Sequence, residues 1–333
     1  MNLLQAIILG IVQGLTEFIP VSSTAHLIFA SRALNLFSGV EQTLRAERTT
    51  ASIAVIQLGT LVAVLIYFAG DILNITRAFV RDHLALLRGQ RSEAAMHKAG
   101  RIGARPSRLS QDAWLGWLVI LGSIPVGVVG LLFKKQIEGT FTKNLWVIAT
   151  MMIVVGVLLW IAERVGKQTR DMKHLGVGDA LAVGGAQVLA LIPGSSRSGS
   201  TIMAGLFAGE VRETAARFSF LLSIPAVAAS GLLELKEAVH KLPPGSGAAL
   251  TVATIVSGVV GYASIFFLLR YLRTHSTGVF IGYRLIVGTL ILILLFGHFI
   301  QPSDNAKAAS THSASASQHT VLARAHIAAP PVR

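Results

Sequence analysis

The sequence predicts an all-α polytopic membrane protein with about six transmembrane helices and two re-entrant helical hairpins in an inverted-topology repeat. The observations behind this prediction are the composition, the length of the uncharged stretches, and two polar breaks inside apolar segments. Of the 333 residues, 53% are hydrophobic and 14% are charged, whereas a soluble domain usually carries about 25% charged residues. A water-soluble globule is therefore excluded.

The predicted spans follow from the length of the uncharged stretches. A helix needs about 20 consecutive apolar residues to cross the bilayer core. Four stretches reach that length, and two shorter ones, 218–233 and 285–300, are flanked by further apolar residues. The four longer stretches are residues 51–69, 113–133, 144–162 and 248–269.

Two other apolar segments are interrupted and do not read as simple spans. Residues 1–33 are broken at 20–24, and residues 179–209 are broken at 193–200. Each break begins with a proline, which removes a backbone donor and ends the preceding helix. Non-helical backbone at membrane depth persists only where protein buries it or where it lines a cavity. We therefore expect two re-entrant hairpins.

Loop charges and internal similarity predict how these hairpins are oriented. Lys and Arg concentrate in the loops at 70–112 and 163–178, which the positive-inside rule places in the cytoplasm, with both chain termini outside. Gln13 and Gln187 precede the two breaks, and Ser-Ile-Pro occurs at both 123–125 and 223–225. The hairpins then enter from opposite sides, as in an inverted repeat with halves of about 1–162 and 178–300.

Net charge and cysteine content exclude further classes. The formal charge of +13 belongs to loops between spans, where anionic lipid attracts it, so we expect no nucleic-acid partner. The absence of cysteine excludes disulfides and thiolate chemistry. Residues 301–333 are rich in Ala, Ser and His, contain no aromatic residue, and are predicted to be a disordered tail.

Glu17 is the most informative residue of the first break. It lies among otherwise uncharged residues, and an intramembrane carboxylate is costly and usually functional. Gln13, four residues earlier, shares its helix face, and His26 follows the break. The simpler alternatives are a glutamate that reaches the membrane interface and a histidine that caps carbonyl groups.

Both breaks are rich in hydroxyl groups, and the second break also contains one arginine. Ser22, Ser23 and Thr24 follow Pro20, and helix capping is their simpler role. Arg197 lies in a Gly/Ser-rich turn that opens a helix, which is typical of an anion site; a purely structural ion pair with Glu17 is the alternative. The candidate binding residues of the second break are Gly194, Ser195, Ser196, Ser198 and Thr201. Together the two breaks suggest one site for an anion, an acid–base pair and a nucleophile, which suits phosphoryl transfer.

Residues 14–26 and 193–201 closely resemble the two signatures of the undecaprenyl-diphosphate phosphatases, also called the bacitracin-resistance protein family. The first signature, (Glu/Gln)-x-x-x-Glu, is met by Gln13 and Glu17, and the second, Pro-Gly-x-Ser-Arg-Ser-x-x-Thr, is met in full. Residues 218–225 and the Tyr283-Arg284 pair also resemble family segments, so the resemblance covers about residues 1–300.

The resemblance implies a bacterial inner-membrane enzyme with one integral-membrane catalytic domain over 1–300. Such an enzyme hydrolyses undecaprenyl diphosphate to the monophosphate, recycles the lipid carrier for peptidoglycan synthesis and gives bacitracin resistance. The site would open toward the periplasm and use a divalent cation, Mg²⁺ or Ca²⁺. The implied roles are metal binding and acid–base chemistry for Glu17 with Gln13, nucleophile for Ser23, proton carrier for His26, and diphosphate clamp for Arg197 with Ser196 and Ser198.

Several alternatives stay open at this point. Gln13 stands where many family members have Glu, and an amide cannot serve as a base, which leaves a two-carboxylate metal site in doubt. Water can replace Ser23 as the nucleophile. A secondary transporter or flippase of a polyprenyl-phosphate or other anionic substrate is the main rival, because paired broken helices are typical of transporters. The asymmetry of the two breaks, one with Glu and His and the other with Arg, favours a hydrolase.

Overall fold

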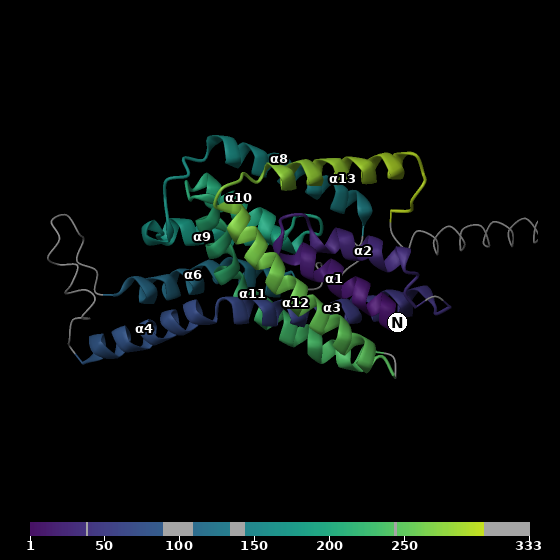
Figure 1. Ribbon diagram of the computed structural model, residues 1–333, viewed down its shortest axis with the longest axis horizontal. Helices are drawn as coiled ribbons and strands as arrows, with labels where there is room; N and C mark the ends of the chain where they lie inside the picture. The colour runs from purple at the N-terminus through teal and green to yellow at the C-terminus, as the bar shows by residue number, and fades with distance from the viewer. Residues whose placement is uncertain (38, 89–108, 134–143, 243–244, 303–333) are drawn as a thin grey trace, which may run out of the picture.

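The computed structural model describes residues 1–37, 39–88, 109–133, 144–242 and 245–302. These residues form helices joined by turns, with one isolated bridge between Arg170 and Glu210, so the predicted fold class is confirmed (Figure 1). Within the described ranges, six helices are long and apolar enough to cross a membrane. They are α3 (Gln42–Tyr67), α6 (Gln111–Leu132), α8 (Leu145–Val165), α11 (Arg212–Lys241), α12 (Gly247–Leu272) and α13 (Gly278–Phe296).

One prediction about the connections is wrong. The segment 70–112 was expected to be a loop, yet its first part forms helix α4 (Ala69–Leu87). The arginines of this segment interrupt its hydrophobic pattern, so the sequence does not reveal that the helix has an apolar face. On that face, Ile75 and Phe79 pack against Gly116 of α6. An amphipathic helix of this kind is stabilised by the face that it buries rather than by its overall hydrophobicity. In Figure 1, α4 and α6 extend together away from the rest of the molecule.

The two broken segments each consist of two short helices. The first comprises α1 (Leu3–Phe18) and α2 (Ser23–Ala33), and the second comprises α9 (Val177–Val188), a short 3-10 turn (Leu189–Leu191) and α10 (Arg197–Phe207). Both helix interruptions therefore occur at the positions that the prolines predict. Re-entry of these hairpins into a bilayer stays a prediction.

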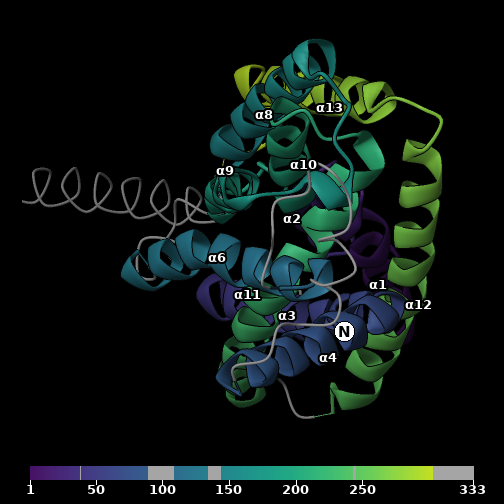
Figure 2. The same ribbon diagram turned by 90° about the vertical axis from the view of Figure 1, so that its left-hand side faces the viewer.

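Helix packing pairs the two halves of the chain. Helix α1 packs on α12 and α9 packs on α6, while α3 contacts α11 and α8 contacts α13. Figure 2 shows α8 and α13 together at one edge and α3, α4 and α11 at the other. Because α12 packs on the first hairpin as α6 packs on the second, these contacts make α6 the counterpart of α12 in the other half of the chain. They likewise make α3 the counterpart of α11. The Ser-Ile-Pro similarity, which joins α6 to α11, does not follow it, and the repeat itself stays a prediction.

The main core lies between the two hairpins and helices α3, α8, α11, α12 and α13. The ring of Phe18 meets that of Phe220 edge to face, with centroids 5.4 Å apart. On the far side of α3, the backbones approach so closely that a Cβ at Gly59 would lie 2.0 Å from the carbonyl oxygen of Thr254. Small residues allow helices to pack this closely in membranes.

A charged cluster, which we name the Arg170 cluster, consists of the partly exposed Arg170 and the buried Asp179 and Glu210. The guanidinium of Arg170 donates to both carboxylate oxygens of Asp179 at 2.6 Å and to the carbonyl oxygens of His174 and Ala208. The carboxyl of Glu210 is fully buried, and neither of its oxygens has a hydrogen-bond partner. The cluster ties the entry and exit of the second hairpin together. The predicted tail lies outside the described residues beyond position 302.

Candidate active site

The first break is a tight turn at the end of α1. Ile19 leaves the helix in an extended conformation and Pro20 prevents its continuation. Ser22 then adopts a φ of 78° at the N-cap position of α2, although its side chain makes no capping hydrogen bond. A positive φ is uncommon for a residue with a Cβ and is concentrated at functional sites. The turn leaves the first backbone N–H groups of α2 without intrahelical partners, as at every helix start.

The second break repeats this geometry with a different sequence. Ser196 caps α10 with a φ of 65°, and its hydroxyl accepts from the backbone N–H of Gly199. Gly194 has a φ of +93°, and a Cβ there would lie 2.3 Å from the carbonyl oxygen of Ile148, so only glycine fits. Gln187 lies nine residues before Ser196, as Gln13 lies nine before Ser22.

Arg284 joins the two breaks. Its side chain is fully buried in α13 and donates to the carbonyl oxygen of Pro20 at 3.3 Å and to those of Gly194 and Ser195 at 3.0 Å. Two further carbonyl groups of α8 complete its partners. A buried charge is costly unless its hydrogen bonds are made. Here five carbonyl groups make them, and both turns are thereby held around one guanidinium.

The predicted anchors of the two breaks meet directly. Nη2 of Arg197 donates a hydrogen bond to Oε1 of Glu17 at 2.7 Å, and both side chains are largely buried. The amide of Gln13 donates to Oε2 of the same carboxylate at 3.1 Å and lies 3.4 Å from the hydroxyl oxygen of Thr60. The ion pair that the sequence left as an alternative therefore forms, and it brings the two hairpins face to face.

His26 is held at both ring nitrogens. Nδ1 lies 2.7 Å from the carbonyl oxygen of Ser22, and Nε2 lies 2.6 Å from the hydroxyl oxygen of Tyr283. The first contact belongs to the turn itself, and the second reaches across to α13. The histidine therefore does more than cap a carbonyl group.

The remaining predicted hydroxyl groups lie in different surroundings. The hydroxyls of Ser196 and Ser198 lie 3.2 Å apart at the start of α10. Ser23, the first residue of α2, is partly buried, whereas Thr24 is exposed. Thr201 points elsewhere, because its hydroxyl contacts the carbonyl oxygen of Arg197 within α10 and the hydroxyl of Ser219 on α11.

The centre of the site is polar, positive and incompletely satisfied. Two helix starts, which carry partial positive charge, lie beside the guanidinium groups of Arg197 and Arg284. Buried oxygens of Gln13, Ser22 and Ser195 have no hydrogen-bond partner. Unpartnered polar atoms are uncommon in protein interiors and call for a ligand or water. The arrangement is suited to an anion that takes over the carboxylate's place on Arg197.

Two residues that approach the breaks were not predicted as site residues. The sequence marked Tyr283 and Arg284 only as part of a family-like segment. Arg284 carried a signal, because it is a charged residue inside a 19-residue apolar helix, and such residues are usually functional. Tyr283 carried none, since tyrosine is common in membrane helices.

The residues at the site offer few metal ligands of their own. In the part of the chain that the structure describes, no group of three or more His, Asp or Glu side chains could hold a metal ion. Glu17 and the unpartnered Oε1 of Gln13 offer two oxygens. Mg²⁺ is often bound by one or two carboxylates together with substrate phosphates and waters. These two oxygens therefore fit a cation that arrives with a diphosphate.

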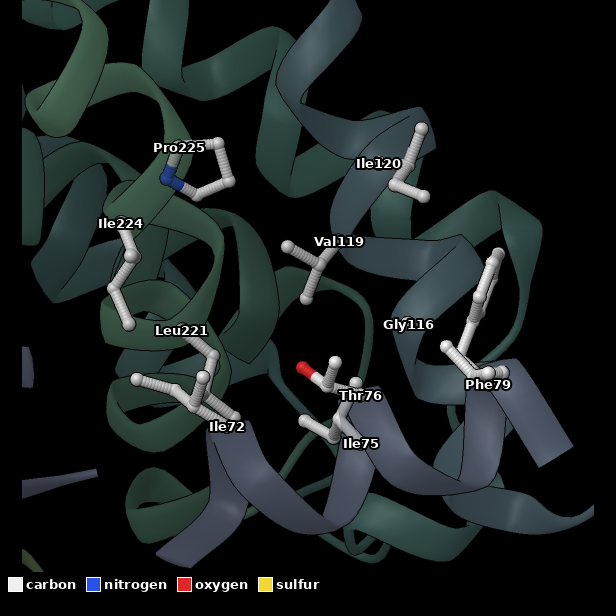
Figure 3. A pocket seen from close by; sticks show the side chains of 11 residues that line it. Ile72, Ile75, Thr76, Phe79, Gly116, Val119, Ile120, Leu221, Ile224 and Pro225 are labelled. Atoms are coloured by element: carbon white, nitrogen blue, oxygen red, sulfur yellow. The ribbon is translucent and has the colours of Figure 1, made fainter. Parts of the chain in front are cut away.

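An apolar groove lies apart from this site, between α4, α6 and α11. Its volume is about 280 Å³, and Figure 3 shows Thr76 of α4 opposite Val119 of α6, with Phe79 beside Gly116 and Ile72 beside Leu221. Of the residues that line it, Thr76 alone has a polar side chain. None of the predicted site residues lines this groove, and it offers no group that could bind phosphate.

The fold and site define a polytopic membrane protein with two broken helices that meet at a buried polar centre containing Arg197 and Arg284. The family described as bacitracin resistance protein BacA matches residues 6–290. A protein of Syntrophobacter fumaroxidans named undecaprenyl-diphosphatase is 50% identical over 298 residues, which cover 90% of this chain and 99% of its own. Proteins of the same name from Mycolicibacterium vanbaalenii and Chloroherpeton thalassium are 47% and 46% identical, over 89% of this chain and 97% of theirs. The chain belongs to the bacitracin resistance protein family.

Proposed function

We propose that this protein hydrolyses undecaprenyl diphosphate to undecaprenyl phosphate and inorganic phosphate. The observation that carries the proposal is the 2.7 Å contact between Arg197 and Glu17, which joins an anion-binding turn to an acid–base group. The similar proteins named undecaprenyl-diphosphatase support this chemistry over transport or flipping of an anionic lipid. Its product would re-enter peptidoglycan synthesis, and faster recycling of the carrier gives resistance to bacitracin.

The diphosphate binds by replacing a carboxylate. Arg197 presents a planar fork that matches two phosphate oxygens, and the starts of α2 and α10 add backbone donors. The hydroxyls of Ser196 and Ser198, 3.2 Å apart at the start of α10, supply further donors. Once phosphate oxygens accept the hydrogen bonds of the Arg197 guanidinium, Glu17 loses its cationic partner and becomes available as a base.

The reaction breaks the bond between the terminal phosphorus and the bridging oxygen. Either the hydroxyl of Ser23 or a water attacks phosphorus, and Glu17 takes the proton from the attacking oxygen. His26 returns a proton to the phosphate products. Attack by Ser23 gives a phosphoserine that water must then hydrolyse, whereas direct attack by water releases phosphate in one step. Positioning and charge neutralisation dominate the rate of such phosphoryl transfers.

A divalent cation, Mg²⁺ or Ca²⁺, fits this scheme through Glu17 and the Oε1 of Gln13. It would neutralise charge that develops on the phosphate oxygens. All other steps belong to side chains of the protein: Arg197 orients the diphosphate, and Arg284 keeps the two turns in register.

We place the protein in the bacterial inner membrane, with the site open toward the periplasm. The support is the excess of Lys and Arg in 70–112 and 163–178, which the positive-inside rule assigns to the cytoplasm. The described part of the 70–112 segment includes α4, whose exposed Arg77 and Arg81 suit the lipid headgroup region.

Phosphate release from undecaprenyl diphosphate by detergent-purified protein tests the proposal. Arg197→Ala and Glu17→Ala should each lower turnover by at least about 100-fold, with Mg²⁺ or Ca²⁺ supplied. The matched control is Arg273→Ala, which breaks an exposed ion pair with Glu213 of the same length, 2.7 Å. Thermal unfolding confirms that the variants fold. A wild type without phosphate release under any cation condition refutes the proposal, and lipid transport in proteoliposomes would then be measured.

A further inference from the structure

The two contacts of His26 assign its tautomer. The carbonyl oxygen of Ser22 can only accept, so Nδ1, 2.7 Å away, carries the hydrogen. In the neutral imidazole Nε2 then has the free lone pair. The hydroxyl of Tyr283, 2.6 Å from Nε2, therefore donates its hydrogen to that nitrogen.

Tyr283 is itself held in place. Its ring lies nearly parallel to the imidazole, with centroids 5.5 Å apart and planes inclined by 17°. The next residue, Arg284, is bonded to carbonyl groups of both breaks, so the α13 backbone is fixed relative to His26 at this point. Tyr283 is 42% exposed. Much of the residue is thus accessible at the surface of the protein, while its hydroxyl is directed at Nε2 of His26.

We propose that Tyr283 is a positioning residue for His26: its hydroxyl holds Nε2 in place and carries protons between that nitrogen and the surrounding water. The inference rests on the proposed function, in which His26 handles the proton. When His26 is charged, the O–H bond of Tyr283 breaks and an N–H bond forms at Nε2. A water molecule at the phenol oxygen supplies the replacement proton. The reverse sequence returns the proton.

The first test removes only the hydroxyl. Tyr283→Phe keeps the ring and its stacking, and should lower kcat for phosphate release by about 10- to 100-fold while KM stays within about twofold. Tyr271→Phe is the matched control, because Tyr271 stacks on His275 at 4.5 Å in the same way, away from both breaks, and should behave as wild type. In the His26→Ala background, Tyr283→Phe should cause no further loss, since both residues act through one proton path.

A second test does not depend on activity. In protein labelled with ¹⁵N-histidine, His26 should show the Nδ1–H tautomer in both proteins, because the carbonyl oxygen of Ser22 keeps the hydrogen on Nδ1. The Nε2 resonance should move toward that of an unbonded imidazole nitrogen in Tyr283→Phe, because that substitution removes the hydrogen bond to Nε2. If Tyr283→Phe folds poorly, 3-fluorotyrosine at position 283 keeps the hydrogen bond but acidifies the phenol, and should move the pH profile of kcat.

Several outcomes overturn the inference. These are a wild-type kcat in Tyr283→Phe, a rise in KM alone, additive losses in the double variant, an unchanged Nε2 resonance, or an unmoved pH profile in the fluorotyrosine protein. If the wild type hydrolyses no diphosphate, the proposed function fails, but the Nε2 resonance still decides whether Tyr283 positions His26.

Discussion

Glu210 should make the stability of this protein fall as pH rises, and Glu210→Gln should remove that dependence. The carboxyl lies outside the membrane-spanning segments, between α10 and α11. It is fully buried without a hydrogen-bond partner. Burial, reinforced by the nearby Asp179 carboxylate, raises the pKa of Glu210 from 4.5 to about 7, although Arg170 opposes the rise.

The magnitude follows from this shift. A raised carboxyl pKa means that the folded state binds the proton more tightly than the unfolded state does. The stabilisation is therefore complete below about pH 4.5 and is lost progressively up to about pH 7. A difference of about 2.5 pKa units corresponds to about 3 kcal/mol. This is a large fraction of the stability of an ordinary domain.

The assay is unfolding by heat and by SDS in detergent between pH 5 and pH 8. The wild type should lose several degrees of melting temperature across this range, whereas Glu210→Gln should stay nearly constant and exceed the wild type at pH 8. Glu213→Gln is the control, because Glu213 lies three residues away in a partly exposed pair with Arg273. That variant should keep the pH dependence of the wild type.

Equal slopes for the wild type and Glu210→Gln would refute the reasoning. Such a result would mean that Glu210 has the same affinity for protons in the folded and unfolded states. A steeper loss in Glu210→Gln would point instead to another group, with Asp179 as the first to examine by Asp179→Asn.

Three further substitutions address the site, each measured by thermal unfolding and phosphate release. Gly194→Ala should lower the melting temperature and activity together, because its φ of +93° and the 2.3 Å approach to the Ile148 carbonyl oxygen leave no room for a Cβ; wild-type stability would contradict this. Arg284→Met should cost at least about 3 kcal/mol, since it leaves buried carbonyl groups unpaired, and an unchanged melting temperature would disprove it. Gln13→Leu removes a donor from Glu17 and should lower turnover with little loss of stability; full turnover would show that this hydrogen bond is dispensable.

The sequence predicted the spans well because hydrophobicity and length are local properties. A stretch such as 144–162 cannot be accommodated in water, so α8 (Leu145–Val165) follows almost directly from composition. The breaks were equally local, since Pro20 and Pro193 adjoin Ser- and Gly-rich turns, whereas Pro125 and Pro225 lie in long apolar runs and stay inside α6 and α11. Helix α4 was missed because its arginines interrupt the apolar run, and its buried face is defined only by its contact with α6.

Contacts between distant segments were less predictable. Residues of both signatures were identified as candidates, yet their arrangement depends on a pairing across 180 residues between Glu17 and Arg197. The sequence left open whether that pair forms. Tyr283 and Arg284 were noted only as part of a family-like segment and were given no role, because their importance lies in the imidazole nitrogen and the carbonyl groups that they reach from α13.

The sequence by itself determined the class of protein, the number of spans, the position of both breaks and the family. Each of these depends on residues that are close together in the chain. Only the tertiary structure decided that the two turns close around Arg284, that Arg197 rests on Glu17, and that His26 is held by Tyr283. Those facts depend on directional hydrogen bonds between separate helices, whose relative placement is set by packing over the whole molecule rather than by any local pattern.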